Sequence, residues 1–346
     1  MILTEAGRAV QQAEAFRPLL RPHRLRPGDV VGIAAPSGPV LFPERLDRGV
    51  RALEARGFRV SVGPVAASRG GSRSAEERAA ELNGLIRDPE VRAVVAAIGG
   101  YRSNGLLELV DWAALRADPK ILVGYSDITA LLLGAVRAAG VVAFHGPTVL
   151  PELAEYPDVL PPTAAGFLRA LTDPRPLGRI EPVAEWTEEF LAWGSADHRP
   201  RLTEPAAEWT WLGDGTASGP LLGGNLETLC CLAGTRFLPD FDGAVVCLET
   251  TATTLDLIDR DLDHLAMLGV FDRMAGLVFG HSFRGGAGFQ AELEQRLTER
   301  FAARSVPCLL GPHLGHTDPM PTLPLGARCA LDTRRRVLEV IDAAVR

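Results

Sequence analysis

Short, continuously apolar runs alternate with longer amphipathic segments between residues 27 and 150. The amphipathic segments have apolar residues at helical spacing. The runs between them are VVGIAA, FRVSV, VRAVVAAI, KILVG and VVAF. Strands that are apolar on both faces and alternate with helices are typical of a parallel sheet covered on both sides. Residues 27–150 are therefore predicted to form a doubly wound α/β domain.

Turn and cap residues predict where several helices of this domain begin and end. Ser74 followed by Glu77 forms the pattern of a capping box at the start of one helix. Gly57 is expected at the end of the preceding helix, where a left-handed residue is common. A further helix is expected from Ile128 to about Ala139.

The pattern changes outside this domain. Residues 1–26 are interpreted as an N-terminal extension with a short amphipathic helix around residues 5–20. Residues 151–218 are rich in Pro, Trp and acidic residues and are predicted to be a connector with long loops that contacts the substrate. Apolar strands return in residues 219–346, which are assigned to a second domain.

Charge and composition exclude several classes of protein. A net charge of −7 argues against a nucleic-acid partner, since phosphate binding needs a basic surface. No uncharged apolar stretch is long enough for a membrane span, and the N-terminus lacks the apolar core of a signal peptide. The five cysteines form no CxxC pair, which favours reduced thiols and a cytoplasmic location.

Three loops follow strands of the first domain and are expected at one edge of its sheet, where ligands bind in open α/β folds. One of them, GYSD, places Ser126 between a strand and a helix. Such a turn could expose a nucleophile, but Ile128 stands where the GxSxG pattern has its second glycine. The tetrapeptide alone therefore favours a helix cap by Ser126 or Asp127.

The loop IGGYRSN brings Gly99 and Gly100 directly after another strand, followed by Tyr101. Two glycines allow main-chain N–H groups to approach a ligand, and an ordinary tight turn explains them equally well. Neither GxGxxG nor a Walker GK[ST] motif occurs, so nucleotide phosphate binding has no motif support.

Histidines and carboxylates in the second domain offer further chemistry. His313, His316 and Asp318 share a Gly/Pro-rich loop whose spacing does not match a zinc motif, and the segment 256–264 lacks the glycine and glutamate of a calcium loop. No metal is expected. His316 fits a general base or a surface residue, and Glu249 at a strand end fits a solvated acid or a group that orients a histidine.

Asn225 and the tryptophans also have two interpretations each. Asn225 in GGNLET either forms the turn before a helix or binds substrate. Four tryptophans gather in the connector, where they either pack an interface or form a flat wall for a ligand; they are Trp186, Trp193, Trp209 and Trp211.

From about residue 25 to residue 341, the chain resembles the LD-carboxypeptidase family of serine peptidases in a series of segments that occur in the same order. The resemblance rests on GDVVGIAAPSGPV, AIGGYRSNGLLELVDW, PKILVGYSDITALLLGA, FHGPTV, GPLLGGNLETLCCLAGT, VVCLETT, GVFDRMAGLVFGH and LGHTDPMPTLPLGARCALD. It implies a Rossmann-like doubly wound N-terminal domain plus a smaller swivelling-type β/α C-terminal domain. It also implies a homodimer that needs no metal or cofactor.

The resemblance assigns roles to single residues. Ser126 corresponds to the nucleophile, Glu249 to the acid and His316 to the base of a Ser–Glu–His triad. The main-chain N–H groups of Gly100, or Gly99, and Asp127 are expected to form the oxyanion hole. Substrate contacts are expected from Gly99, Tyr101, Asn225 and either Trp186 or Trp193.

Within the family, the IGGYRSN loop and the Trp-rich connector are more similar to the branch containing the microcin C immunity peptidase than to the murein-recycling branch. The expected substrate is a small peptide or an aminoacyl- or peptidyl-nucleotide conjugate. The alternatives are a murein tetrapeptide L,D-carboxypeptidase, a serine-hydrolase fold recruited for acyl transfer, and a non-catalytic two-domain binding protein.

Overall fold

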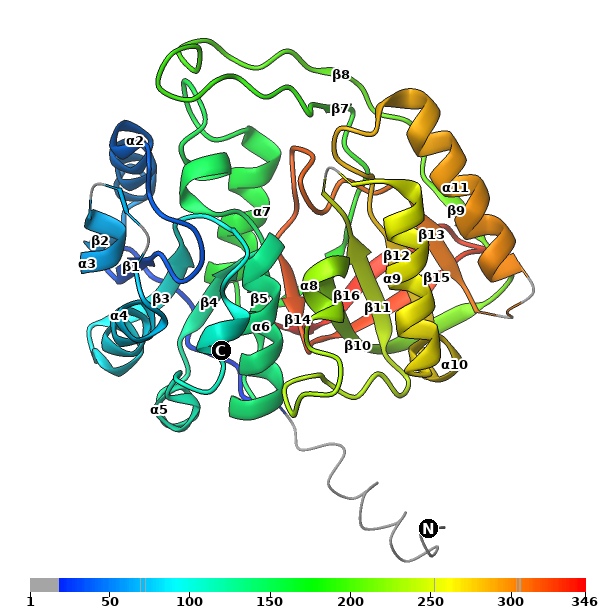
Figure 1. Ribbon diagram of the computed structural model, residues 1–346, viewed down its shortest axis with the longest axis horizontal. Coiled ribbons are helices and arrows are strands. Elements are labelled where there is room, and N and C mark those ends of the chain that lie inside the picture. Colours follow the sequence, from blue (N-terminus) through cyan, green and yellow to red (C-terminus); the bar gives the residue numbers. More distant parts are fainter. Residues whose placement is uncertain (1–18, 69, 72, 252, 303, 305) are drawn as a thin grey trace, which may run out of the picture.

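The computed structural model describes residues 19–346, apart from residues 69, 72, 252, 303 and 305. Two lobes stand side by side, each built around its own sheet, with helix α6 between them (Figure 1). The helix expected around residues 5–20 lies almost entirely outside the described residues.

The first sheet has six strands in the order β14-β5-β4-β3-β1-β2, and only the edge strand β14 is antiparallel to its neighbour. The strands are β1 (Val30–Ala34), β2 (Arg59–Val62), β3 (Val91–Ala96), β4 (Ile121–Gly124), β5 (Ala143–His145) and β14 (Leu323–Leu325). Because the strand order reverses between β1 and β3, a crevice is expected at their carboxyl ends.

Helices cover both faces of this sheet. Val30 and Ala34 of β1 belong to the apolar cluster that contains α4, whereas Val31 and Ile33 belong to the cluster that contains α2. The doubly wound prediction is therefore confirmed. The helices and helical turns are α2 (Pro43–Glu54), α3 (Pro64–Ala67), α4 (Ala75–Arg87), η1 (Asn104–Leu106), α5 (Trp112–Ala117), η2 (Ser126–Ile128), α6 (Thr129–Gly134), η3 (Ala135–Ala139) and η4 (Val149–Leu153).

The predicted helix boundaries are close to the observed ones. The capping box of Ser74 and Glu77 is present at the start of α4. The chain is helical from Ser126 to Ala139 and stops at the left-handed Gly140. Helix α2 ends at Glu54, and Gly57 adopts a φ of +89° in the turn that follows.

The second sheet has eight strands in the order β6-β16-β15-β10-β11-β12-β13-β9, of which β10 to β13 are parallel. Its strands from residue 216 onwards are β10 (Thr216–Asn225), β11 (Val245–Glu249), β12 (Gly276–Phe279), β13 (Cys308–Leu310), β15 (Arg328–Asp332) and β16 (Val337–Ala343). The helices are α8 (Leu226–Cys230), α9 (Leu255–Met267), α10 (Val270–Arg273) and α11 (Gly286–Ala302).

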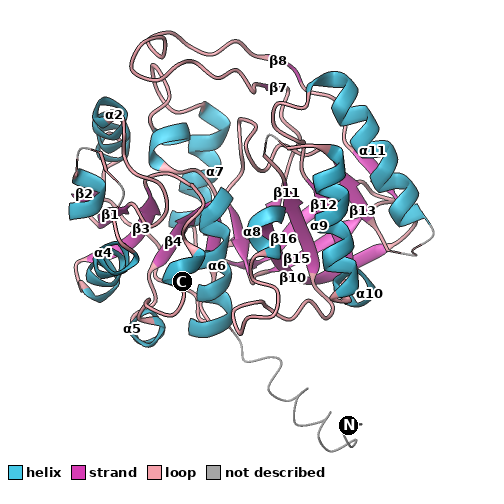
Figure 2. Cartoon of the chain, in the orientation of Figure 1, coloured by secondary structure: helices cyan, strands magenta, loops and turns pink. Residues whose placement is uncertain are grey.

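The connector is more ordered than its sequence indicates. It contains α7 (Pro161–Thr172), β6 (Pro176–Arg179), β7 (Glu185–Trp186), β8 (Glu204–Pro205) and β9 (Thr210–Leu212). Strands β6 and β9 form the two edges of the second sheet. Long loops around β7 and β8 arch over the top of both lobes (Figure 2).

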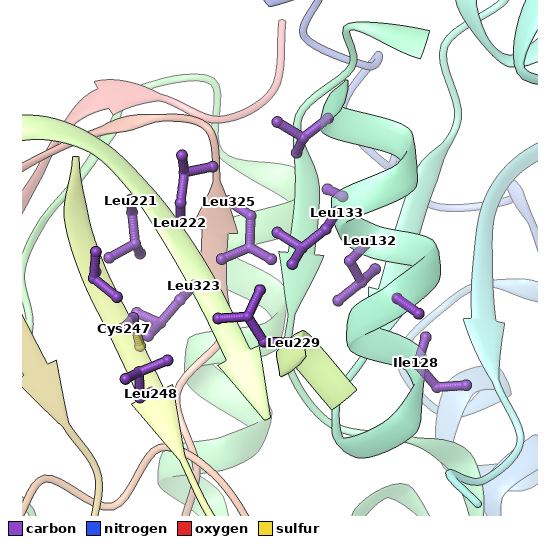
Figure 3. Close-up of a cluster of buried hydrophobic side chains, with 14 of the residues drawn as sticks. Ile128, Leu132, Leu133, Leu221, Leu222, Leu229, Cys247, Leu248, Leu323 and Leu325 are labelled. Carbon is purple, nitrogen blue, oxygen red and sulfur yellow. The ribbon is translucent and has the colours of Figure 1, made fainter. Parts of the chain in front are cut away.

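An apolar core joins the lobes. Leu132 and Leu133 on α6 lie opposite Leu229 of α8 and Leu323 and Leu325 of β14 (Figure 3). Close packing of this kind resists relative movement, so it fixes the position of residues at the start of α6 against the second lobe. Within the described residues, no helix combines the length and the apolar character needed to cross a bilayer.

Candidate active site

Ser126, His316 and Glu249 meet in the structure although they are far apart in the chain. His316 Nε2 lies 3.1 Å from Ser126 Oγ, and His316 Nδ1 lies 2.7 Å from Glu249 Oε2. Ser126 follows β4, Glu249 ends β11, and His316 lies in the loop after β13. Each lobe therefore contributes part of the arrangement. A hydroxyl that contacts a base, which in turn contacts an orienting carboxylate, can act as an activated oxygen nucleophile.

Ser126 has a strained backbone. Its φ is +60°, a region that non-glycine residues rarely occupy and that is common at functional sites. The turn is tight because Gly99 packs against it: a Cβ on Gly99 would lie 2.9 Å from Ser126 Cβ and 3.0 Å from its Oγ. Gly99 is thus required by the close approach of the two loops.

Asp127 does not cap the helix that follows. Its buried carboxylate instead accepts hydrogen bonds from Ser37 Oγ and from the main-chain N–H groups of Arg102 and Ser103, both at 2.8 Å. These partners belong to the loops after β1 and β3. One carboxylate therefore holds the loop containing Gly100 beside Ser126, which is the placement that an oxyanion hole requires.

The pKa values of the paired groups shift in the direction expected for an oriented imidazole. Burial alone would raise the pKa of Glu249, but His316 outweighs it and lowers the pKa of this carboxyl. Burial likewise would lower the pKa of His316, and the Glu249 carboxylate reverses the effect. The fully buried Glu249 thus favours the protonated imidazole.

Asn225 caps α8, which supports the turn-forming interpretation. Its Oδ1 accepts hydrogen bonds from Thr228 N at 3.0 Å and from Thr228 Oγ1 at 2.9 Å. Asn225 also stands opposite Glu249 in the β10–β11 pairing. Its buried side chain lies close to the Glu249 carboxyl, whose pKa it helps to lower.

A cavity of about 310 Å³ opens at Ser126 and His316. Of the predicted substrate contacts, Gly99 and Trp193 line it, whereas Trp186 and Asn225 do not. Gly100, which is expected in the oxyanion hole, also lines the cavity. Tyr101 is also absent from the lining and is 91% exposed. Trp193 has an arginine over one face, with the Arg45 guanidinium carbon 4.4 Å from the ring centroid.

Several lining residues have no signal in the sequence. Tyr125 donates a hydrogen bond of 2.6 Å to Glu152, and burial together with Asp318 raises the pKa of Glu152 to about 8. Arg201 lies 2.7 Å from Glu155 and 2.9 Å from Asp318. Because these residues come from separate segments without a shared motif, only the folded chain brings them together.

Metal ligation has no geometric basis in the part of the chain that the structure describes. There, no three His, Cys, Asp or Glu side chains are grouped so as to hold an ion. His313, which the sequence places near a carboxylate, instead contacts Thr317 Oγ1 through Nδ1 at 3.1 Å.

Family models match both lobes. Residues 31–146 match the LD-carboxypeptidase N-terminal domain, and residues 218–331 match the LD-carboxypeptidase C-terminal domain. The fold and these domains define a two-domain α/β peptidase.

Individual relatives agree over nearly the whole chain. A putative carboxypeptidase of Vibrio cholerae is 34% identical over 92% of this chain and 97% of its own length. The microcin C7 self-immunity protein MccF of Escherichia coli is 31% identical over 91% and 94%. A probable murein peptide carboxypeptidase of Bacillus subtilis is 32% identical over 94% and 95%.

A solved structure of MccF in complex with glutamyl sulfamoyl guanosine covers 94% of this chain and 100% of its own, with a TM-score of 0.87 and 29% identity. The chain therefore belongs to the LD-carboxypeptidase family, and the predicted two-domain fold and peptidase class are confirmed.

Proposed function

We propose that this peptidase hydrolyses an amide bond near the C-terminus of a small peptide or of an aminoacyl- or peptidyl-nucleotide conjugate, with Ser126, Glu249 and His316 as a catalytic triad. The observation that carries the proposal is the pair of hydrogen bonds joining the three side chains, at 3.1 Å and 2.7 Å. The strained, cavity-facing Ser126 supports it further.

The mechanism follows from this geometry. His316 Nε2 takes the proton from Ser126 Oγ as the oxygen attacks the amide carbon, and the protonated imidazole then gives that proton to the leaving nitrogen. Glu249 accepts the Nδ1–H bond and stabilises the imidazolium. Water, activated by the same imidazole, then releases the acyl group from Ser126.

The developing oxyanion needs donors. We assign this part to the main-chain N–H groups of Gly100 and Asp127, each of which is expected to lower the barrier by roughly 3 kcal/mol. The Asp127 carboxylate supports the assignment because it ties the Gly100 loop to the turn that carries Ser126.

A nucleotide conjugate is favoured as substrate by one feature of the cavity. Trp193 lines it and offers a flat, half-buried ring on which a base can stack. MccF itself has been solved with glutamyl sulfamoyl guanosine and with aspartyl sulfamoyl adenosine.

The polar residues at the site are expected to differ in part from those of MccF. One MccF active-site mutant replaces a serine, an asparagine and a lysine by alanine. The single lysine of this chain, Lys120, is fully buried and paired with Asp118. No lysine is therefore available here to take the third of those places.

The central test replaces Ser126 by alanine. Hydrolysis should fall by about 10⁴- to 10⁶-fold while thermal unfolding stays unchanged, because the nucleophile is lost and no buried contact is removed. A fluorophosphonate probe should label the wild-type protein and the exposed-site control Ser218→Ala, but not Ser126→Ala. Turnover near the wild-type rate in Ser126→Ala would exclude the triad. Absence of labelling in the wild-type protein would favour a non-catalytic binding protein.

The substrate is tested in a parallel assay with an aminoacyl sulfamoyl adenosine and a murein tetrapeptide containing its L,D bond. Cleavage of only the tetrapeptide would replace our proposal by a murein peptide carboxypeptidase, the activity that appears, as probable, in the name of the Bacillus relative. Competition between water and added amines separates hydrolysis from acyl transfer.

We further propose that the protein is a cytoplasmic homodimer. The five free cysteines support the cytoplasmic location. The family resemblance supports the homodimer, which light scattering can test.

A further inference from the structure

The loop that carries His316 has no regular secondary structure between β13 and β14. Its far end is held by the connector: Thr187 N donates to Asp318 O at 2.7 Å, and Asp318 N donates to Thr187 O at 3.0 Å. The connector thus forms a short antiparallel bridge two residues beyond the catalytic imidazole.

The residue before this bridge contacts the other end of the same loop. Trp186 stacks on His313 with ring centroids 4.7 Å apart and planes 19° apart. His281, from the loop after β12, completes the group at 4.5 Å from Trp186 and 5.2 Å from His313. His313 Nδ1 in turn contacts the hydroxyl of Thr317, the fully buried neighbour of His316.

Both imidazoles in this group are held neutral. Burial lowers the pKa of His313 to about 3 and also lowers the pKa of His281. Uncharged rings can stack on the indole without bringing a buried charge into the contact. Trp186 is also absent from the cavity lining, in contrast to Trp193.

We propose that Trp186 is a positioning residue for His316. Together with Thr187 it holds residues 313–318 at both ends, an arrangement called the clasp below, and so sets the distance from the imidazole to Ser126. The inference rests on the proposed triad and assigns the two connector tryptophans to different tasks, Trp186 to the catalytic loop and Trp193 to the ligand. A displacement of about 1 Å at a reacting group can reduce the rate by about 100-fold, so the clasp affects turnover more than binding.

The experiment measures the rate of fluorophosphonate labelling of Ser126, which requires an aligned His316 but no knowledge of the substrate. Trp186→Leu and His313→Leu each break the stack and should slow labelling by at least about tenfold, whereas Trp186→Phe keeps a ring face and should restore most of the rate. Trp209→Leu, a connector tryptophan packed against Trp211, should label at the wild-type rate. In steady-state assays with a substrate that the protein cleaves, Trp186→Leu should lower kcat with little change in KM, and Trp193→Leu should raise KM.

Two outcomes separate the inference from the proposed function. If the wild-type protein does not label, the triad itself is wrong. Circular dichroism shows which of Trp186→Leu and His313→Leu remains folded. If the wild-type protein labels and a folded variant labels at a rate within twofold of it, the proposed role of Trp186 is wrong and the triad stands. A rise in KM without loss of kcat in Trp186→Leu would show that Trp186 contacts the ligand and does not position His316.

Discussion

Glu152 is a buried carboxyl group at the edge of the cavity that forms no ion pair with any described residue. Its Oε1 accepts from Tyr125 and its Oε2 from Thr148 N at 2.7 Å. Burial and the nearby Asp318 raise its pKa to about 8, while Arg201 opposes the shift. At neutral pH the group is therefore mostly uncharged.

This raised pKa makes stability depend on pH. Between an unfolded pKa of about 4.3 and the folded value, only the folded state holds the proton, so the contribution of Glu152 is complete at acid pH and is lost as the pH rises to about 8. Glu152→Gln cannot titrate. Its free energy of unfolding, from urea titrations between pH 5 and 8, should therefore fall less with pH than that of the wild type. Glu108→Gln, at an exposed pair with Arg236, is the control. Parallel curves for the wild type and Glu152→Gln would show that Glu152 is ionised throughout.

The residues of the proposed triad could be suggested from the sequence only because three distant segments occur in one order. Ser126 alone favoured a helix cap, since a hydroxyl before a helix is common. Glu152 and Arg201 were not found, because burial and an opposite charge arise from neighbours that the local sequence does not reveal.

At the scale of elements, the strand–turn–helix unit around Ser126 depends on the glycine turn after β3. A methyl group on Gly99 would meet Ser126 Cβ at 2.9 Å, closer than such atoms approach in proteins. The contact joins two neighbouring parallel strands at their carboxyl ends, so relief would require one of the loops to move.

Gly99→Ala should therefore lower kcat by about tenfold to 100-fold, because Ser126 Oγ or the Gly100 N–H leaves its aligned position. Gly105→Ala is a matched control, since a Cβ there meets nothing within 4 Å. Steady-state kinetics with the substrate found in the parallel assay give the comparison. Unchanged kcat in Gly99→Ala would show that the turn yields without moving the reacting groups.

The strands and helices of the first lobe followed from apolar periodicity and cap residues, as the capping box of α4 illustrates. The short strands of the connector did not. β6 and β9 are polar, proline-containing or only three to four residues long, and they become strands because the edges of the second sheet offer them main-chain partners.

At the scale of the molecule, Arg201 links three parts of the chain. It comes from the connector and binds Glu155 after η4 and Asp318 beside the catalytic loop. The side chains of Arg201, Glu155 and Asp318 are 14%, 7% and 9% exposed. Removing the arginine would leave two buried carboxylates near Glu152 without their cation.

Arg201→Met should consequently lower the free energy of unfolding by about 3–5 kcal/mol, the usual result of breaking a buried pair from one side. Arg199→Met removes an exposed partner of Glu189 and should have no measurable effect. Urea titrations at pH 7 compare the two. A small loss in Arg201→Met would mean that Glu155 and Asp318 take up protons instead, and the stability of the variant would then fall steeply above pH 7.

The amino-acid sequence alone determined the class of fold and the family, and it supplied the three residues that we propose as a triad. Apolar periodicity and the order of motifs are properties of the chain itself, so they can be recognised without coordinates. The distances between those residues, the different surroundings of Trp186 and Trp193 and the shifted pKa values required the folded chain. They depend on which distant groups share a buried, weakly polar space, and that is a property of packing between the lobes.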